Sequence, residues 1–133
     1  MNRYLGIDYG TKRIGVALSD EDGGFAFPKA VIEVKNDAQV FAELKAMAVR
    51  EKVRTVVVGL PLNFDFQETP QTHRVKAFVE KLKKELPDTP VVFENEVLST
   101  KEAEKSGGVS KNMIDASSAA ILLQSFLDRH RQK

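Results

Sequence analysis

The first third of the chain alternates apolar positions with small or polar ones, a pattern typical of β-strands. Apolar side chains fall on every second position in residues 4–8 and again in residues 14–18, with a tight turn over residues 9–12 between them. This arrangement predicts an antiparallel hairpin. A second turn at Gly23 and Gly24 leads into a third strand over residues 25–34, where Pro28 predicts a position at the edge of a sheet.

The pattern then changes to the period of amphipathic helices. Asn36 and Gln39 have the spacing of a capping box. The apolar residues after them have helical spacing: Val40, Phe41, Leu44 and Ala48. Thr69 followed by Pro70 predicts the start of a second helix. The apolar stripe of this second helix consists of Val75, Phe78, Val79, Leu82 and Leu86.

Two further apolar runs predict strands. Residues 55–60 (TVVVGL) are apolar without alternation, so we expect a central strand that is covered on both faces and ends at residues 59–61. Residues 91–93 form a fifth strand that leads to Glu96. Between the fourth strand and the second helix, residues 63–69 are expected to be the most mobile loop.

The last quarter of the chain predicts two helices. Ser99 and Glu102 have capping-box spacing for a short helix, which the glycines at positions 107 and 108 interrupt. Ser110 is a suitable cap for a last helix that extends to about Arg131. The predicted order is therefore three antiparallel strands, helix, strand, helix, strand and helix.

Composition narrows the classes of protein that these elements can form. With 133 residues, of which 42% are hydrophobic and 29% charged, the chain suits one soluble domain over residues 1–133. The lack of cysteine excludes thiolate chemistry. A net charge of +1 gives no global attraction for nucleic acid, so such binding has to be local. No apolar run is long enough for a secretory or membrane-spanning segment, and we expect a cytoplasmic protein without membrane contact.

Three acidic residues occupy informative positions. Ligands of α/β sheets gather at the carboxyl ends of parallel strands, where Asp8 and Glu96 are expected. Asp115 shares a stripe of the last helix with small and apolar residues, so it points toward the body of the protein, where a carboxylate needs a proton or a cation. If the three acids converge, they suit Mg²⁺ or Mn²⁺, and two such ions can clamp the attacking water and the leaving oxygen of a phosphodiester.

Each acid also has a purely structural explanation. Asp8 can accept backbone hydrogen bonds in its turn, and Glu96 can be an exposed acid at a strand end. Asp115 can be favoured by the helix dipole, or pair with Lys111 one turn earlier. These explanations cover the acids singly, but together they do not explain the inward stripe of the last helix.

Four stretches match a known family: GIDYGTKRIGVALSD, VVVGLPLN, NEVLSTKEAE and IDASSAAILLQSFL. They run in the order, and over nearly the whole length, of the YqgF family, also called RuvX, which the chain resembles. This family is a branch of the ribonuclease H-like proteins that is related to Holliday junction resolvases and assigned to pre-16S rRNA cleavage. The resemblance implies an α/β, ribonuclease H-like fold: a five-stranded mixed sheet of order 3-2-1-4-5, with strand 2 antiparallel and helices on both faces.

The resemblance also implies the site. The presumed metal-binding and catalytic acids of the family map onto Asp8, Glu96 and Asp115. Two departures affect this site. The third motif usually reads Asp-Glu-Arg, but Asn95 and Val97 flank Glu96 here, which removes an arginine suited to phosphate. In addition, Phe66 stands where a glycine commonly follows the loop aspartate, which is Asp65 in this chain.

Four further residues are candidates for binding substrate. Thr11, Lys12 and Arg13 are predicted to hold a phosphate of the nucleic acid, although they can also be ordinary polar residues of a hairpin. Asn63 can touch the substrate or simply close a turn. The acid that precedes the first three residues favours the functional interpretation of that turn.

The resulting hypothesis is a cytoplasmic, Mg²⁺- or Mn²⁺-dependent endonuclease, monomeric or homodimeric, that acts on structured RNA. By resemblance its substrate is the 5′ end of precursor 16S rRNA. One alternative is Holliday junction resolution on branched DNA by the same acids. A second is a non-catalytic module that binds nucleic acid, which the altered third motif makes credible. The DYGT turn also resembles the phosphate loop of actin-like ATPases, but those proteins need two such domains around the nucleotide.

Overall fold

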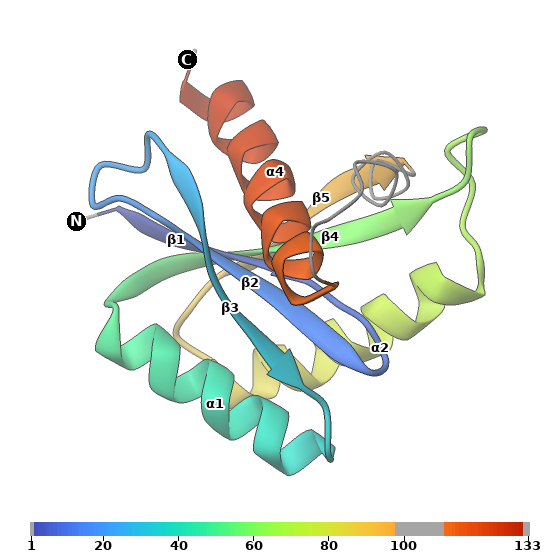
Figure 1. The fold of residues 1–133 in the computed structure, drawn as a ribbon, viewed down its shortest axis with the longest axis horizontal. Helices are drawn as coiled ribbons and strands as arrows, with labels where there is room; N and C mark the ends of the chain where they lie inside the picture. The colour runs from blue at the N-terminus through green and yellow to red at the C-terminus, as the bar shows by residue number, and fades with distance from the viewer. Residues whose placement is uncertain (1, 98–110, 132–133) are drawn as a thin grey trace.

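The computed structural model describes residues 2–97 and 111–131, with side chains for residues 2–96 and 115–130. Its elements are β1 (Arg3–Asp8), β2 (Arg13–Ser19), β3 (Ala26–Glu33), α1 (Asp37–Arg50), β4 (Val53–Leu62), α2 (Pro70–Glu85), β5 (Val91–Val97) and α4 (Lys111–Arg131) (Figure 1). The short helix predicted near Ser99, the glycine break after it and the cap predicted at Ser110 lie outside the described residues. No helix within the described ranges is long and apolar enough to cross a membrane.

The five strands form one mixed sheet of order β3-β2-β1-β4-β5. β2 runs antiparallel to both β1 and β3, whereas β1, β4 and β5 are parallel to one another. The expected fold class, strand order and antiparallel second strand are therefore confirmed. β3 lies at the edge, as Pro28 predicts, because it pairs with β2 alone.

Two strands are longer than their apolar runs. β4, expected to end at residues 59–61, continues to Leu62, and β5 continues from Phe93 to Val97. The reason is mutual pairing, since Pro61 lies opposite Glu96 in the parallel register of the two strands. The β1 ladder on the other side of β4 has already ended at Val58, so Pro61 has a strand neighbour on one side only, where proline is tolerated.

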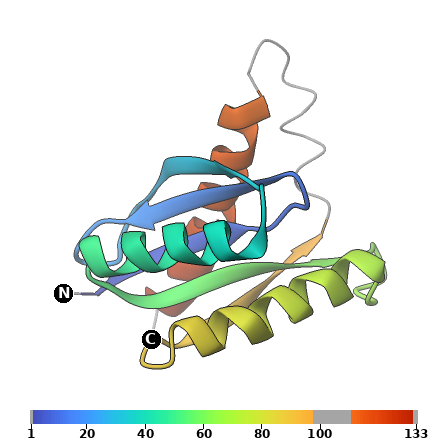
Figure 2. The same cartoon turned by 90° about the horizontal axis from the view of Figure 1, so that it is seen from below.

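Helices cover both faces of the sheet. The larger core cluster joins one face to α1 and α2 through their predicted apolar stripes, and the smaller one joins the other face to α4. Figure 2 is seen from the side of α1 and α2, with α4 behind the sheet. Both helix starts follow the sequence signals: Asn36 and Gln39 form a reciprocal capping box at α1, and Thr69 and Thr72 form one at α2.

Small residues allow α4 to lie directly on the sheet. A Cβ atom added to Gly15 would lie 2.0 Å from the carbonyl oxygen of Asp115, and one added to Gly6 would lie 2.8 Å from the Cβ of Leu123. Real Cβ atoms do not approach other atoms this closely, so a side chain at either position would push the helix away. The glycines of β1 and β2 therefore determine how close α4, which carries Asp115, lies to the sheet.

Candidate active site

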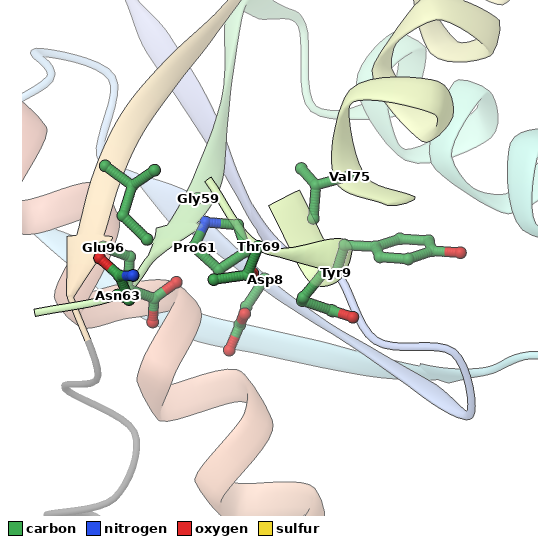
Figure 3. A pocket seen from close by; sticks show the side chains of 10 residues that line it. Asp8, Tyr9, Gly59, Pro61, Asn63, Thr69, Val75 and Glu96 are labelled. Atoms are coloured by element: carbon green, nitrogen blue, oxygen red, sulfur yellow. The ribbon is translucent and has the colours of Figure 1, made fainter. Parts of the chain in front are cut away.

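A cleft of about 370 Å³ opens at the carboxyl ends of the three parallel strands. Asp8 from β1, Gly59 from β4 and Glu96 from β5 line it on the sheet side (Figure 3). Asn63 from the loop after β4 and Val75 from α2 also line it, with Asn63 next to Glu96. The pocket thus occupies the edge where parallel α/β sheets place their ligands.

Asp8 is the last residue of β1 and lies in the electrostatic field of the other two acids. Burial, and then the charges of Glu96 and Asp115, raise its pKa from 3.8 to about 8. The two neighbours influence Asp8 although they come from β5 and α4, which are far from it in the sequence. The structure therefore brings the three predicted acids into one region, as the strand-end positions and the inward helix stripe suggested.

Glu96 depends on a glycine of the neighbouring strand. A Cβ atom at Gly59 would lie 2.7 Å from Oε2 of Glu96 and 2.9 Å from Cδ2 of Leu122. Gly59 therefore leaves the space that the carboxylate uses between β4 and α4. The site predicted from the sequence does not include Gly59, although a single glycine within a continuous β-branched run is a signal of close approach.

Asp115 has a cationic partner, which is Arg13. Nε of Arg13 lies 2.8 Å from Oδ2 of Asp115, and the two side chains are 32% and 28% exposed. The guanidinium predicted to hold a substrate phosphate is thus engaged with one of the predicted acids. The alternative partner, Lys111, has its side chain outside the described part of the chain.

The donor set fits a hard divalent cation in its chemistry, because carboxylate oxygens are the ligands that Mg²⁺ and Mn²⁺ prefer. Burial and then repulsion from Glu96 and Asp115 raise the pKa of Asp8, and a bound cation would favour the ionised carboxylate against both effects. The geometry is more open than a closed ligand shell: within residues 2–96 and 115–130, no three Asp, Glu or His side chains are gathered closely enough to hold an ion.

The other predicted substrate residues are placed differently from one another. Thr11 and Lys12 are exposed in the β1–β2 turn, beside Arg13. Asn63 lines the cleft, but its Oδ1 also accepts hydrogen bonds from the backbone N–H groups of Asp65 and Gln67, both at 2.9 Å. Asn63 therefore closes a turn, as one of the two sequence interpretations predicts, and its contact with a substrate stays a prediction.

Glu94 is a buried acid outside the site predicted from the sequence. Its side chain is 5% exposed, accepts a hydrogen bond from Oγ of Ser125 at 3.1 Å and forms an ion pair with Arg129. Glu94 lies two residues before Glu96 on β5, so both point to the same face of the sheet. The Glu94 contacts hold the second half of α4 against that face.

Solved structures with a similar fold show the fold class of this chain. A *Thermus thermophilus* RuvC in complex with a Holliday junction substrate matches with a TM-score of 0.59 and 13% sequence identity, over 98% of this chain and 96% of that chain. The fowlpox virus Holliday junction resolvase matches with a TM-score of 0.57 and 14% identity, over 96% of this chain and 99% of that one. The fold is therefore the ribonuclease H-like fold of these resolvases.

The chain belongs to the RuvX family, described as "Holliday junction resolvase", whose model matches residues 2–129. A *Nitratidesulfovibrio vulgaris* relative is 44% identical over 95% of this chain and 93% of its own length. A *Lawsonia intracellularis* relative is 41% identical over 96% of this chain and 94% of its own length. Both relatives are named "Putative pre-16S rRNA nuclease".

Proposed function

We propose that this protein is a Mg²⁺- or Mn²⁺-dependent endonuclease that cleaves phosphodiester bonds of structured RNA at the 5′ end of precursor 16S rRNA. The observation that carries the proposal is the convergence of Asp8, Glu96 and Asp115 at one edge of the sheet, close enough for two of them to raise the pKa of the third. The substrate in this proposal is taken from the relatives, which are named "Putative pre-16S rRNA nuclease". As part of this proposal, residues 1–133 act as one nuclease domain in the cytoplasm.

In this proposal, Asp8 and Glu96 at the ends of β1 and β5 and Asp115 on α4 would hold the metal ions. Such ions, when bound, supply an activated water and stabilise the leaving oxygen. Arg13 holds the carboxylate of Asp115 in place and, together with Thr11 and Lys12, contributes polar and cationic groups to one side of the site. Asn63 faces the same cleft from the loop after β4.

The test is cleavage of a precursor 16S rRNA fragment in the presence of Mg²⁺ or Mn²⁺. We expect the wild-type protein to cleave it, and Asp8→Asn to lower the rate by roughly a hundredfold or more, because an amide is a poor ligand for a hard cation. The matched control is Asp22→Asn, which makes the same chemical change at an exposed turn outside the cleft. Activity that is equal in Asp8→Asn, or undiminished by EDTA, would contradict the proposal.

Resolution of branched DNA is the second candidate. It is favoured by the description of the family and by the fold shared with a RuvC bound to a Holliday junction substrate. The same acids would serve either substrate, so the site alone does not choose between them. Side-by-side cleavage of a four-way DNA junction and of precursor 16S rRNA separates the two candidates, and preferred cleavage of the junction would replace the RNA assignment.

A further inference from the structure

The loop after β4 presents two phenylalanine rings to solvent. Phe64 is 76% exposed and Phe66 is 68% exposed. In Figure 1 this loop projects past the end of β4 before the chain turns into α2. Exposed single apolar residues are common, but here two strongly exposed aromatic residues lie two positions apart on one short turn.

The turn itself is tightly hydrogen-bonded. Oδ1 of Asn63 accepts from the N–H groups of Asp65 and Gln67, and the N–H of Phe66 donates to the carbonyl oxygen of Asn63 at 2.9 Å. The N–H of Asn63 donates to the carbonyl oxygen of Gln67 at 3.1 Å. The backbone under the two rings is therefore preorganised by contacts that involve neither ring.

Phe66 has a conformation that does not suit its residue type. Its φ is 59°, in the left-handed region where a bulky residue costs roughly 1 kcal/mol or more and glycine costs nothing. Its ring, being exposed, gains little from burial in return. The requirements of the turn therefore favour glycine, and the presence of phenylalanine needs an explanation outside the folded chain.

The position of the turn connects it to the candidate active site. Leu62 at the end of β4 and Asn63 after it line the cleft, and so do Thr69 and Gln71 at the start of α2. The rings are thus carried on a segment that is anchored in the pocket wall on both sides. Phe64 and Phe66 are not themselves among the residues that line the cleft, but they lie in the chain between residues that do. Phe25 and Phe27, the other exposed phenylalanines among the described residues, belong to the edge of the sheet around β3.

We propose that Phe64 and Phe66 form a stacking platform that binds an unpaired nucleobase of the substrate beside the bond to be cleaved. The proposal rests on the proposed nuclease function, because it takes the nucleic acid to lie in the adjoining cleft. Stacking of a base on an aromatic side chain contributes about 1–3 kcal/mol and requires no particular base. Two rings on a turn suit this task, whereas a stable protein partner needs about 800 Å² on each side.

The test measures RNA affinity without cleavage. The probe is an RNA hairpin with a single-stranded 5′ extension that carries 2-aminopurine, and the protein carries Asp8→Asn to prevent hydrolysis. We expect Phe64→Ala and Phe66→Gly each to weaken binding about tenfold and to reduce the quenching of 2-aminopurine. The matched control is Phe25→Ala, which removes an equally exposed ring outside the cleft and leaves binding unchanged. A fully paired RNA of equal length should not distinguish these variants.

The melting temperature distinguishes a variant that has lost a contact with RNA from one that no longer folds. Because glycine adopts a φ of 59° freely, Phe66→Gly should keep or raise the melting temperature while it weakens binding. If the parent protein binds the RNA and the Phe64 and Phe66 variants bind as tightly as Phe25→Ala, the platform is overturned and the nuclease proposal stands. If no variant and no parent binds RNA, the nuclease proposal fails with it. If the wild type is a dimer and Phe64→Ala is a monomer with unchanged RNA affinity, the rings serve self-association. That result would contradict the proposed binding of a nucleobase.

Discussion

At the scale of single residues, Asp8 links the chemistry of the site to the stability of the fold. Its pKa is raised from 3.8 to about 8, mainly by burial and then by Glu96 and Asp115. The folded protein thus binds this proton more tightly than the unfolded chain, so the contribution of Asp8 to stability is fully present below a pH of about 4 and is lost as the pH rises toward 8. We expect the free energy of unfolding of the metal-free protein to fall by on the order of 5 kcal/mol across this range.

Asp8→Asn is the direct check of this pH dependence, because asparagine does not ionise. Urea unfolding at a series of pH values should show a much smaller loss of stability for Asp8→Asn than for the wild type. Asp22→Asn serves as the control, and its profile should follow that of the wild type. An Asp8→Asn profile that falls as steeply as the wild-type profile would show that other groups cause the dependence.

Arg13 and Asp115 should matter more for activity than for stability. Their ion pair joins residues 102 positions apart, and both side chains are about one-third exposed, so solvent screens the attraction. We expect Arg13→Gln to change the free energy of unfolding by less than about 1 kcal/mol. The same change should lower the cleavage rate at least about tenfold, since the carboxylate of Asp115 loses the group that orients it. A stability loss without any loss of rate would make the pair purely structural.

At the scale of elements, glycines decide how closely α4 approaches the strands. The carbonyl oxygen of Asp115 that would meet a Cβ at Gly15 belongs to the helix backbone and cannot rotate away. We expect Gly15→Ala to destabilise the protein by about 3 kcal/mol.

At Gly59 the nearest atoms are the ends of the Glu96 and Leu122 side chains, which can move. Gly59→Ala should therefore remain folded, with a smaller loss of stability, but cleave RNA poorly because Glu96 is displaced.

Thermal unfolding and RNA cleavage, measured together on both glycine variants, distinguish these effects. Equal melting temperatures for Gly15→Ala and the wild type would mean that α4 is not held where the structure places it. Full activity of Gly59→Ala would mean that the position of the Glu96 carboxylate is not critical for the reaction.

The elements also explain which parts of the fold the sequence could predict. The starts of α1 and α2 depend on local signals, namely the caps at Asn36 and Thr69, and both were found correctly. The ends of β4 and β5 depend on pairing between strands, such as Pro61 opposite Glu96, and were placed too early. Local chemistry determines a cap, whereas a strand continues as long as a distant segment provides its hydrogen-bond partners.

At the scale of the whole molecule, some features of the site could be predicted from the sequence and others could not. The convergence of Asp8, Glu96 and Asp115 was predictable, because strand ends meet at one edge and a helix stripe has a defined inward direction. The pairing of Arg13 with Asp115 was not, since it depends on where α4 crosses the β1–β2 hairpin. The clearance that Gly59 gives to Glu96 likewise becomes visible only when β4, β5 and α4 are placed together.

Binding of a divalent metal ion to these three acids should stabilise the whole folded protein. A cation that binds only the folded protein raises the free energy of unfolding by about 2.7 kcal/mol when its concentration is a hundred times its dissociation constant. For a chain of this size, this corresponds to a rise of roughly 10 °C in melting temperature. We expect Mn²⁺ to raise the melting temperature of the wild type and of Asp22→Asn, and to raise it more at pH 8 than at pH 6, because protons compete for Asp8. Asp8→Asn should lose most of this rise. An equal rise in Asp8→Asn would place the bound metal elsewhere, and the carboxylates at the end of the sheet would then need another explanation.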